Sequence, residues 1–581
     1  MCSARSVALL ALLLQVFVTV PVLPQSAGQS RRGLIAIPVG DGKVYLGWRL
    51  LVTDPADVAF DIYRRSSGGP TTKLNSRPLT ETTDFIDREA ERGAQCAYSV
   101  RPVVNGAEGA PCAEVRPVWT GEFKPYVSIK LDGDHTFQKV AVADLDGDGR
   151  CDFVIKQPDG NVDPYVNYWK PSPGTYKLEA YLAEGTLLWR HDLTWAIEQG
   201  IWYSPYVVYD LDGDGKAEVA VKTGVGDPRD ADGRVQTGPE YLTLLDGMTG
   251  APITQIDWPP REWFGDTSSP YNYASRNQLG VAYLDERDPY LIVERGTYNV
   301  IVVIAYRFRD GKLSEHWRWD NRTEPRSCWG QGAHWLHAAD VDADGRDEVV
   351  IGSAVIDDDG KLLWTTGLGH PDHVYVGDID PRRPGLEIYY GMETRQRERN
   401  GMCLVDAATG KILWGHEGPT RHVHGQGLCS DIDPRYPGCE CYSADTDEQK
   451  RFAWARLRTS TGTVISEEDL GGFNPWAAYW DADLQRELVR QGRIEKYHGE
   501  TLLRTIDGGR TVLVADLFGD WREELVVSHP GELRIYTTTI PARDRRVSLM
   551  EDRLYRMDVV MAAMGYTQVP MTSYDLSSSR P

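Results

Sequence analysis

The stretch Val140–Lys156, VAVADLDGDGRCDFVIK, places an acidic turn between two apolar segments that have the composition of β-strands. The same unit returns at Val207–Lys222, VVYDLDGDGKAEVAVK. A mean step of about 53 residues separates the copies, which fits one four-stranded blade. The sequence therefore predicts an all-β chain with an eight-bladed β-propeller, or with seven blades as the competing count. Counted by their first acidic residue, the eight copies begin at Asp144, Asp210, Asp285, Asp340, Asp378, Asp431, Asp481 and Asp516.

A second repeated signature lies between the acidic turns. It is a Gly-containing turn that leads into a strand ending in Trp. Because the spacing follows the blades, we expect each Trp to wedge between neighbouring blades, which is a structural role. The copies of the Gly–Trp signature are Gly185–Trp189, Gly360–Trp364, Gly410–Trp414 and, more loosely, Gly311–Trp317.

Helical periodicity is confined to Arg486–Lys496.

Two segments precede the repeats. In Met1–Ser30, Arg5 stands before the apolar stretch Val7–Val22 and small residues follow, which is typical of a secretory signal peptide. We assign residues 1–28 to this signal and expect a secreted protein, extracellular or periplasmic, with no other membrane segment. Residues 29–120 alternate apolar and polar side chains between Pro, Gly and Asn turns, which predicts a β-sandwich of fibronectin type III character. Residues 121–577 would then form the propeller and carry the active site.

The charge of the chain limits its partners. A formal net charge of −22 argues against nucleic acid. It would also repel an anionic polymer, unless bound cations reverse the sign locally.

The acidic turns could supply those cations. Each complete copy has carboxylates at loop positions 1, 3, 5 and 9 and a Gly at position 6, which can gather the oxygen ligands that Ca²⁺ requires. The residues after the turns lie in strands, so these are not EF-hands. We expect several calcium sites, more structural than catalytic. The complete sets are Asp144, Asp146, Asp148 and Asp152; Asp210, Asp212, Asp214 and Glu218; and Asp340, Asp342, Asp344 and Glu348.

The histidines cluster in the sequence. Eight of the twelve lie between His316 and His424, and three Gly-flanked groups stand before successive acidic turns. Corresponding positions of successive blades line one face of a propeller, so these groups should meet at one cavity. The groups are residues 330–334, 369–373 and 422–427.

Several segments carry a resemblance to a known family. They are Arg295-Gly296 with Tyr298, the GQGAH of residues 330–334, the GHPD of residues 369–372, DIDPRYPG, and ADLFGDWREE followed by LRIYTTTIP. Together they resemble polysaccharide lyase family 11, the rhamnogalacturonan lyases, over nearly the whole mature chain. The resemblance implies an eight-bladed, calcium-binding propeller that cleaves the rhamnosyl–galacturonate backbone of pectin by β-elimination. Such a reaction needs a base for the proton α to the uronate carboxylate and a cation to neutralise that carboxylate.

The chain departs from the family pattern at four places. Gln426-Gly427 stands where the family has Arg-Gly, and residues 507–510 end in Arg510 where the family has Lys. Met392-Glu393 stands where the family has His-Glu, and GHPD where it has GHGD. Arg421, His422 or His424 could replace the Arg, and Arg510 the Lys. The resulting catalytic candidates are Arg510, Tyr555, His370 and His424. The substrate-binding candidates are His334, Arg421, His422, Gln426, Arg295 and Tyr298. To the three complete calcium sets the metal candidates add Asp372, Asp378 and Asp380.

The leading hypothesis is a secreted, calcium-dependent lyase that acts on rhamnogalacturonan and works as a monomer. The alternatives are a lyase for another rhamnose- and uronate-containing polymer and a non-catalytic propeller that binds polysaccharide. A quinone-dependent dehydrogenase propeller would need a cofactor-stacking site that no segment identifies. The choice between endo and exo cleavage stays open at this point.

Overall fold

The computed structural model describes residues 32–577, except 41, 68, 91–95 and 120–123. The predicted signal peptide lies outside the described residues. None of the described helices is long and apolar enough to cross a bilayer.

The N-terminal part consists of two small sheets that share one core. Trp48, Phe60 and Tyr98 fill this core and are completely buried. The shared core fits a sandwich, and its assignment to the fibronectin type III class stays a prediction. One sheet joins β1 (Ile35–Pro38), β2 (Val44–Gly47) and β5 (Asp84–Asp87), and the other joins β4 (Thr71–Lys73), β3 (Ala59–Ser66), β6 (Cys96–Val104) and β7 (Ala107–Glu108).

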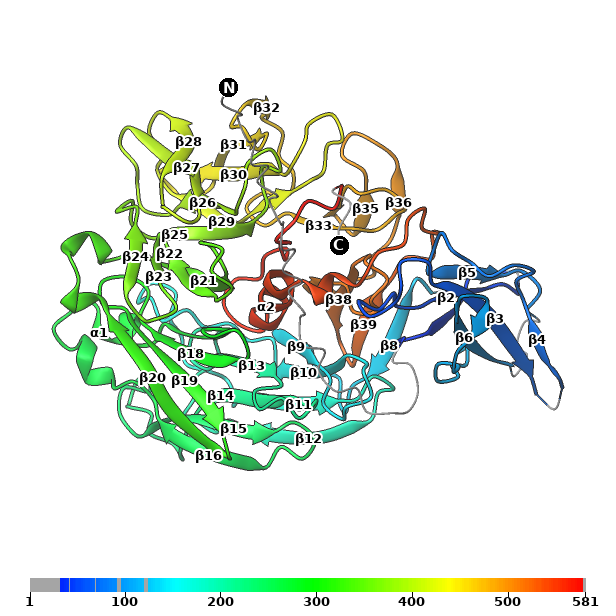
Figure 1. The fold of residues 1–581 in the computed structure, drawn as a ribbon. Coiled ribbons are helices and arrows are strands. Elements are labelled where there is room, and N and C mark those ends of the chain that lie inside the picture. Colours follow the sequence, from blue (N-terminus) through cyan, green and yellow to red (C-terminus); the bar gives the residue numbers. More distant parts are fainter. Residues whose placement is uncertain (1–31, 41, 68, 91–95, 120–123, 578–581) are drawn as a thin grey trace, which may run out of the picture.

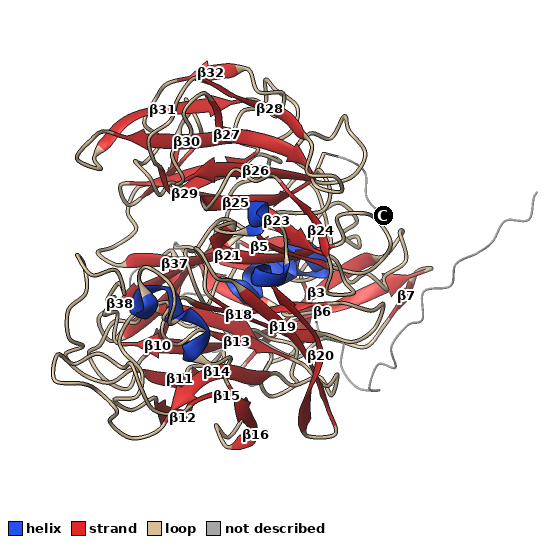
Figure 2. Ribbon diagram, turned by 90° about the vertical axis from the view of Figure 1, so that its left-hand side faces the viewer, coloured by secondary structure: helices blue, strands red, loops and turns tan. Residues whose placement is uncertain are grey.

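The rest of the described chain forms eight four-stranded antiparallel sheets, and strands dominate the view in Figure 2. The first four, innermost strand first, are β9 (Lys139–Ala143), β10 (Asp152–Gln157), β11 (Lys177–Tyr181) and β12 (Leu187–Asp192); β13 (Tyr206–Tyr209), β14 (Glu218–Gly224), β15 (Glu240–Asp246) and β16 (Pro252–Asp257); β17 (Asn277–Ala282), β18 (Tyr290–Arg295), β19 (Val302–Arg309) and β20 (Lys312–Asp320); and β21 (Gly332–Ala339), β22 (Glu348–Gly352), β23 (Ala354–Ile356) and β24 (Leu362–Thr365).

The other four sheets follow the same order. They are β25 (Pro371–Gly377), β26 (Glu387–Met392), β27 (Arg399–Asp406) and β28 (Ile412–Glu417); β29 (Val423–Ser430), β30 (Glu440–Thr446), β31 (Phe452–Arg458) and β32 (Val464–Ser466); β33 (Trp476–Ala478), β34 (Glu487–Arg490), β35 (Arg493–Glu495) and β36 (Thr501–Leu503); and β37 (Arg510–Ala515), β38 (Glu524–His529), β39 (Glu532–Tyr536) and β8 (Tyr126–Lys130).

The innermost strands form a ring of contacts. Each one touches the innermost strand of the next sheet, from β9 through β13, β17, β21, β25, β29 and β33 to β37, and β37 touches β9. The last sheet takes its outermost strand, β8, from the chain directly after the N-terminal part. This strand pairs antiparallel with β39. The first and last parts of the ring therefore share one sheet.

Helix α2 (Arg553–Met561) fills the axis of the ring. It contacts β9, β13, β17, β21 and β37, and Figure 1 shows it at the centre of the surrounding sheets. Seven of its nine residues are buried, and the other two are Arg553 and Arg556. The other helices are short: η1 (Arg261–Phe264), α1 (Pro270–Ala274), η2 (Asn321–Thr323), η3 (Arg326–Cys328) and η4 (Leu549–Glu551).

The repeated tryptophans interlock neighbouring sheets, as expected. The indole N–H of Trp364, on an outermost strand, donates to the carbonyl of Ala407 in the following sheet at 2.9 Å. Gly410 of that sheet lies against the indole ring, and a Cβ at this position would come within 2.5 Å of it. The same arrangement joins Trp189, Trp317 and Trp414 to Gly247, Asp358 and Ser460.

The helical expectation for Arg486–Lys496 is wrong. These residues form β34 and β35, joined by a tight turn at Gln491 and Gly492, which both have positive φ. Val489 pairs with Ile494 across this hairpin and both side chains are buried, so strand pairing and packing override the helical pattern.

Candidate functional site

The innermost strands place two kinds of residue at opposite ends of the ring. Every acidic turn follows an innermost strand and joins it to the second strand of its sheet. His334, Asp372 and His424 instead lie within the first three residues of their strands. Six residues separate His334 from Asp340, about 20 Å of extended chain. We call these the acidic end and the histidine end.

Four side chains converge at the histidine end. His334, His370, Asp372 and Glu393 each offer one ligand atom, and these atoms lie within 4.8 Å of one another. The Nε2 atoms of His334 and His370 are 3.2 Å apart, and Glu393 Oε2 lies 3.0 Å from the latter. We call these four residues the histidine–carboxylate cluster.

A second pair of histidines is attached through Asp372. Its Oδ2 lies 2.7 Å from His424 Nδ1 and also accepts the backbone N–H of Gly425 at 2.7 Å. His422 Nε2 lies 3.1 Å from His424 Nδ1, and His422 Nδ1 lies 3.7 Å from Glu393. The side chain of His424 is 40% exposed, so it is the member of this group that a ligand can reach.

Aromatic rings surround the cluster on its other side. Trp202 and Tyr566 pack against His334 with ring centroids 4.6 and 4.7 Å away, and Tyr298 lies 4.7 Å from His370. The guanidinium of Arg276 stands over Trp202 and Tyr298. Arg276 is held in turn by Asp163 at 2.8 Å, so the loop after β10 is tied to the site. Trp202, Tyr298, Tyr566, Arg276 and Asp163 thus form one wall of the site.

Burial and charge set the protonation of the cluster. Burial, with the neighbouring His370, lowers the pKa of His334 to about 4. Burial alone would raise the pKa of Glu393, but its contacts with His334 and His370 hold it well below the usual range. Burial would also lower the pKa of His424, but the hydrogen bond to Asp372 raises it above its ordinary value. The site thus combines neutral imidazoles, ionised carboxylates and one more basic histidine.

The cluster has the donor set of a divalent metal site. His370 Nδ1 contacts the carbonyl oxygen of Gly332, which keeps the proton on Nδ1 and turns the lone pair of Nε2 toward Glu393. Two acceptors thus face each other at 3.0 Å. Asp372 Oδ1 is buried and has no hydrogen-bond donor among the described residues. A cation between these groups would satisfy all of them. The two imidazoles suit Zn²⁺ or another transition metal, and the two carboxylates also suit Mn²⁺ or Ca²⁺.

The acidic end has the donors for calcium. In the first turn Asp144 accepts the N–H groups of Gly147 and Gly149 at 2.7 Å, and Asp152 accepts that of Leu145 at 2.9 Å. The three complete turns each bring three ligand atoms within 4.8 Å of one another. Burial raises the pKa of Asp152 to about 7 and of Glu218 to about 8, because low-dielectric surroundings and neighbouring carboxylates disfavour the charged form.

Two degenerate turns carry their own cations. Arg382 Nε lies 2.6 Å from Asp380, and Arg435 Nε lies 2.8 Å from Asp433. An arginine in the turn partly neutralises the carboxylate that would bind calcium, so Asp380 is a poorer ligand than its counterparts in the complete turns. Asp378, at the start of the same turn, accepts the N–H of Asp575 from the C-terminal segment.

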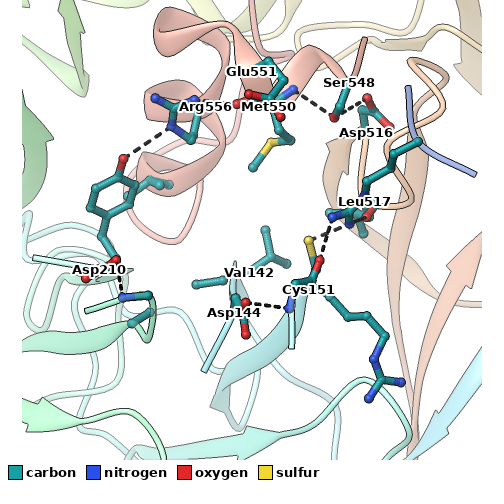
Figure 3. A pocket seen from close by; sticks show the side chains of 18 residues that line it. Val142, Asp144, Cys151, Asp210, Asp516, Leu517, Ser548, Met550, Glu551 and Arg556 are labelled. Atoms are coloured by element: carbon teal, nitrogen blue, oxygen red, sulfur yellow. Dashed lines mark hydrogen bonds between the residues drawn. The ribbon is translucent and has the colours of Figure 1, made fainter. Parts of the chain in front are cut away.

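A cavity of about 300 Å³ lies at the acidic end, between the first, second and last turns and α2. Ser548 donates to Asp516 (Figure 3). Arg556 donates to the hydroxyl of Tyr209 at 3.3 Å. The described residues that line this cavity include no member of the histidine–carboxylate cluster. The cavity therefore belongs to the packing of α2 against the turns.

The structure brings His334, His370, Asp372, His422 and His424 together, with Tyr298 beside them. It leaves five other candidates outside the cluster: Gln426, Arg295, Tyr555, Arg510 and Arg421.

Gln426 and Arg295 are occupied elsewhere. Gln426 is buried and its side-chain amide donates to the carbonyl of Pro475 at 2.7 Å. Arg295 has no exposed surface and contacts Glu240 at 2.7 Å and the carbonyl of Ala274 at 2.8 Å. Both residues join neighbouring sheets, and neither presents a free donor to a ligand.

Tyr555 lies inside the ring, on α2, and is completely buried. Its hydroxyl donates to Glu523 at 2.7 Å and accepts the backbone N–H of Asp516 at 3.0 Å. Arg510 and Arg421 lie at the histidine end. Arg510 donates to the carbonyls of Phe137 and Gln138. Arg421 is exposed and pairs with Glu448 at 3.3 Å.

Sequence reasoning missed Glu393, Trp202 and Arg276. Glu393 follows β26, the second strand of its sheet, and reaches the cluster only because Met392 pairs with Pro371. That register could not be derived before the strand ends were known. Trp202 and Arg276 precede innermost strands, as the histidine groups do, so position before the strand was the signal that could have found them.

Two family models match the chain over most of its length. Residues 132–580 match the model of the rhamnogalacturonan lyase family 11 C-terminal domain, and residues 26–119 match that of the rhamnogalacturonan I lyase β-sheet domain. The chain is 38% identical to rhamnogalacturonan endolyase YesW and 36% identical to rhamnogalacturonan exolyase YesX, both of Bacillus subtilis (strain 168). These alignments cover 98% and 94% of this chain and 95% of each relative.

Solved structures give the same result. The crystal structure of YesW aligns with a TM-score of 0.84 at 37% identity, covering 95% of this chain and 97% of that one. A rhamnogalacturonan lyase of Bacillus licheniformis aligns with a TM-score of 0.83 at 36% identity, covering 94% and 96%. The chain therefore belongs to rhamnogalacturonan lyase family 11 and is a polysaccharide lyase.

Proposed function

We propose that this protein is a secreted, calcium-dependent lyase that cleaves the rhamnosyl–galacturonate backbone of rhamnogalacturonan by β-elimination. We also interpret its eight sheets as the blades of an eight-bladed β-propeller. The ring of contacts between the innermost strands supports the blade count. The activity of the relatives supports the substrate, and the exported compartment rests on the sequence of residues 1–28.

The observation that carries the proposal is the link between His424 and the histidine–carboxylate cluster through Asp372. Oδ2 of Asp372 binds His424 Nδ1 at 2.7 Å, while Oδ1 faces His334 Nε2 at 3.5 Å. A carboxylate that accepts the Nδ1 proton of His424 leaves the lone pair on Nε2, on the exposed side of the ring. His424 is therefore oriented as a general base next to the cluster.

The reaction assigns a task to each group. His424 Nε2 takes the proton from C5 of the uronate, the electron pair forms the C4–C5 double bond, and the bond from C4 to the rhamnosyl oxygen breaks. The leaving oxygen takes up a proton from water or from the His424 imidazolium and departs as the rhamnosyl hydroxyl. A divalent cation held by His334, His370, Asp372 and Glu393 would neutralise the uronate carboxylate and so make the C5 proton more acidic. Arg276 and Tyr298, which stand on the other side of the cluster, would orient the sugar. Calcium in the acidic turns would stabilise the ring without entering the reaction.

The first experiment measures the product. Wild-type protein with Ca²⁺ and, separately, with Mn²⁺ is incubated with rhamnogalacturonan, homogalacturonan and rhamnose–glucuronate polymers. Ultraviolet absorbance of the unsaturated uronide and reducing ends are followed together. New reducing ends without that absorbance would contradict elimination. Activity on a rhamnose–glucuronate polymer alone would move the substrate to the second candidate class. Product length distribution separates endo from exo cleavage.

The second experiment tests the base. His424→Gln is expected to lower kcat by about 10²- to 10⁴-fold, the usual contribution of a positioned base, with metal binding retained. His416→Gln is the matched control, because His416 lies on the outermost strand β28 and contacts Arg458 at 2.9 Å. Equal activity in the two variants would rule out His424 as the base and favour Arg421 or Arg510.

A further inference from the structure

The loop of residues 393–398 leaves its sheet at the histidine end. Met392, the last residue of β26, pairs with Pro371, the first residue of β25. The next residue, Glu393, contacts His370. The loop therefore begins in the histidine–carboxylate cluster and runs outward from it before β27 begins at Arg399.

Hydrogen bonds fix the shape of this loop. The N–H of Thr394 donates to the carbonyl of His370 at 3.0 Å, and the N–H of His370 donates to Thr394 Oγ1 at 2.8 Å. Gln396 faces inward, because its side-chain amide donates to the carbonyl of Leu368 at 2.8 Å and its own carbonyl accepts the N–H of Thr420 at 3.0 Å. Its two neighbours, Arg395 and Arg397, are exposed.

The guanidinium groups of Arg395 and Arg397 have no partner. Within the described chain, neither makes a hydrogen bond, an ion pair or a ring contact. Nearby arginines differ: Arg399 pairs with Glu417 at 3.0 Å, and Arg421 pairs with Glu448 at 3.3 Å. The protein has 85 acidic and 63 basic side chains. Two uncompensated cations beside the cluster are therefore the groups that an anionic polymer would meet favourably on an otherwise acidic molecule.

We propose that Arg395 and Arg397 form a subsite for uronate carboxylates of the polysaccharide, next to the sugar that is cleaved. This inference rests on the proposed function. The Cα atoms of Arg395 and Arg397 lie within about 7 and 14 Å of that of Glu393, since an extended residue spans at most about 3.6 Å. Their side chains can therefore reach sugars that follow the one held at the cluster. A guanidinium binds a carboxylate through two parallel hydrogen bonds, which suits a planar uronate group.

The subsite is tested with Arg395→Gln/Arg397→Gln on the metal-loaded protein. Exposed ion pairs contribute little each, so we expect the KM for rhamnogalacturonan to rise roughly two- to tenfold with kcat unchanged. The wild-type KM should rise with salt, and that rise should be smaller in the variant. Arg399→Gln is the matched control, because the same change on the same segment removes an arginine that is already paired.

The role of the substrate's uronate carboxylates is tested with a series of chemically modified oligosaccharides. On rhamnogalacturonan oligosaccharides in which the uronates beyond the cleaved one are carboxyl-reduced, the double variant and the wild type should have the same KM. An equal loss on reduced and unreduced chains would show that the loop's shape matters rather than its charge, and would overturn the inference. The inference would also be overturned if the double variant had the same KM and the same salt dependence as Arg399→Gln.

If the proposed lyase activity is wrong, the subsite can still be tested separately by binding. If the wild type shows no elimination on any polymer, binding of intact rhamnogalacturonan to both proteins is measured by affinity electrophoresis. Weaker binding by the double variant alone would support the subsite in the absence of turnover. Equal binding by the wild type and both variants would overturn it.

Discussion

Replacing Tyr555 by Phe separates a structural phenol from a catalytic one. The Tyr555 hydroxyl is buried on α2, 2.7 Å from Glu523 and 3.0 Å from the backbone N–H of Asp516. The substitution leaves Glu523 with other donors, because Arg486 contacts both of its oxygens at 2.7 and 2.8 Å. The N–H of Asp516, in contrast, loses its acceptor in a place that water does not reach.

The magnitude follows from these contacts. A lost hydrogen bond to a carboxylate and an orphaned buried N–H together cost about 2–3 kcal/mol. The entropy of unfolding is about 2.1 cal/mol/K per residue, so a ring of about 450 residues changes by about 1 kcal/mol per kelvin near Tm. We therefore expect Tyr555→Phe to lower Tm by about 2–3 °C. At 25 °C the folded variant should retain the wild-type kcat and KM, since Tyr555 lies away from the cluster.

Differential scanning calorimetry and the ultraviolet lyase assay measure the two quantities on the same samples. Tyr566→Phe is the contrasting variant: Tyr566 packs on His334 at the histidine end, and its loss should affect activity more than stability. A Tyr555→Phe protein with an unchanged Tm and a strongly reduced kcat would refute the reasoning, because it would mean that the phenol reaches the substrate.

Three further predictions concern stability. Burial opposes ionisation of Glu179, but hydrogen bonds, with His135 first, lower its pKa to about 2. A lowered pKa stabilises the fold above about pH 4.3, the value of the unfolded chain, and this stabilisation is lost as the pH falls through about 2; Glu179→Gln should cost about 1–3 kcal/mol at pH 7 by urea unfolding and about a quarter of that near pH 2.5. Gly410→Ala should destabilise by about 2 kcal/mol or more, because Gly410 has a φ of +69° and its Cβ would meet Trp364, whereas Gly385→Ala, also at positive φ but in open space, should cost less. Glu218→Gln should reduce the rise in Tm that Ca²⁺ produces over chelator, and an undiminished calcium response would show that the second turn binds no ion.

Much of the architecture could be predicted because every sheet has an acidic turn and four of the eight also have the Trp signature. The acidic turn marks the passage from the first to the second strand, and the Trp, where present, marks the fourth. The acidic turn is local, so it can be recognised even where Asp285 and Asp481 retain little of the full pattern. Helix α2 was not predicted, because its nine residues make only about two and a half turns, too short a repeat to be recognised in the sequence.

The site was predictable only along the innermost strands. His334, Asp372 and His424 occupy equivalent places at the start of successive strands, and the ring geometry brings them together. Glu393 comes from a second strand, and its place depends on a pairing register that the sequence does not display. Tyr555 was selected by resemblance, which identified its place in the sequence but not its burial.

The pairing of β8 with β39 has a consequence for the order of assembly. About 400 residues separate Lys130 from Glu532, its partner in that pair. While the chain is being synthesised, β8 has no neighbour, and the last sheet cannot be completed until the other seven have been made. Closing so long a loop is slow compared with forming each local hairpin, so the final contact should limit the folding rate. A protein truncated after β36 would leave β8 as a solitary exposed segment and the axis without its helix, and we expect such a fragment to aggregate.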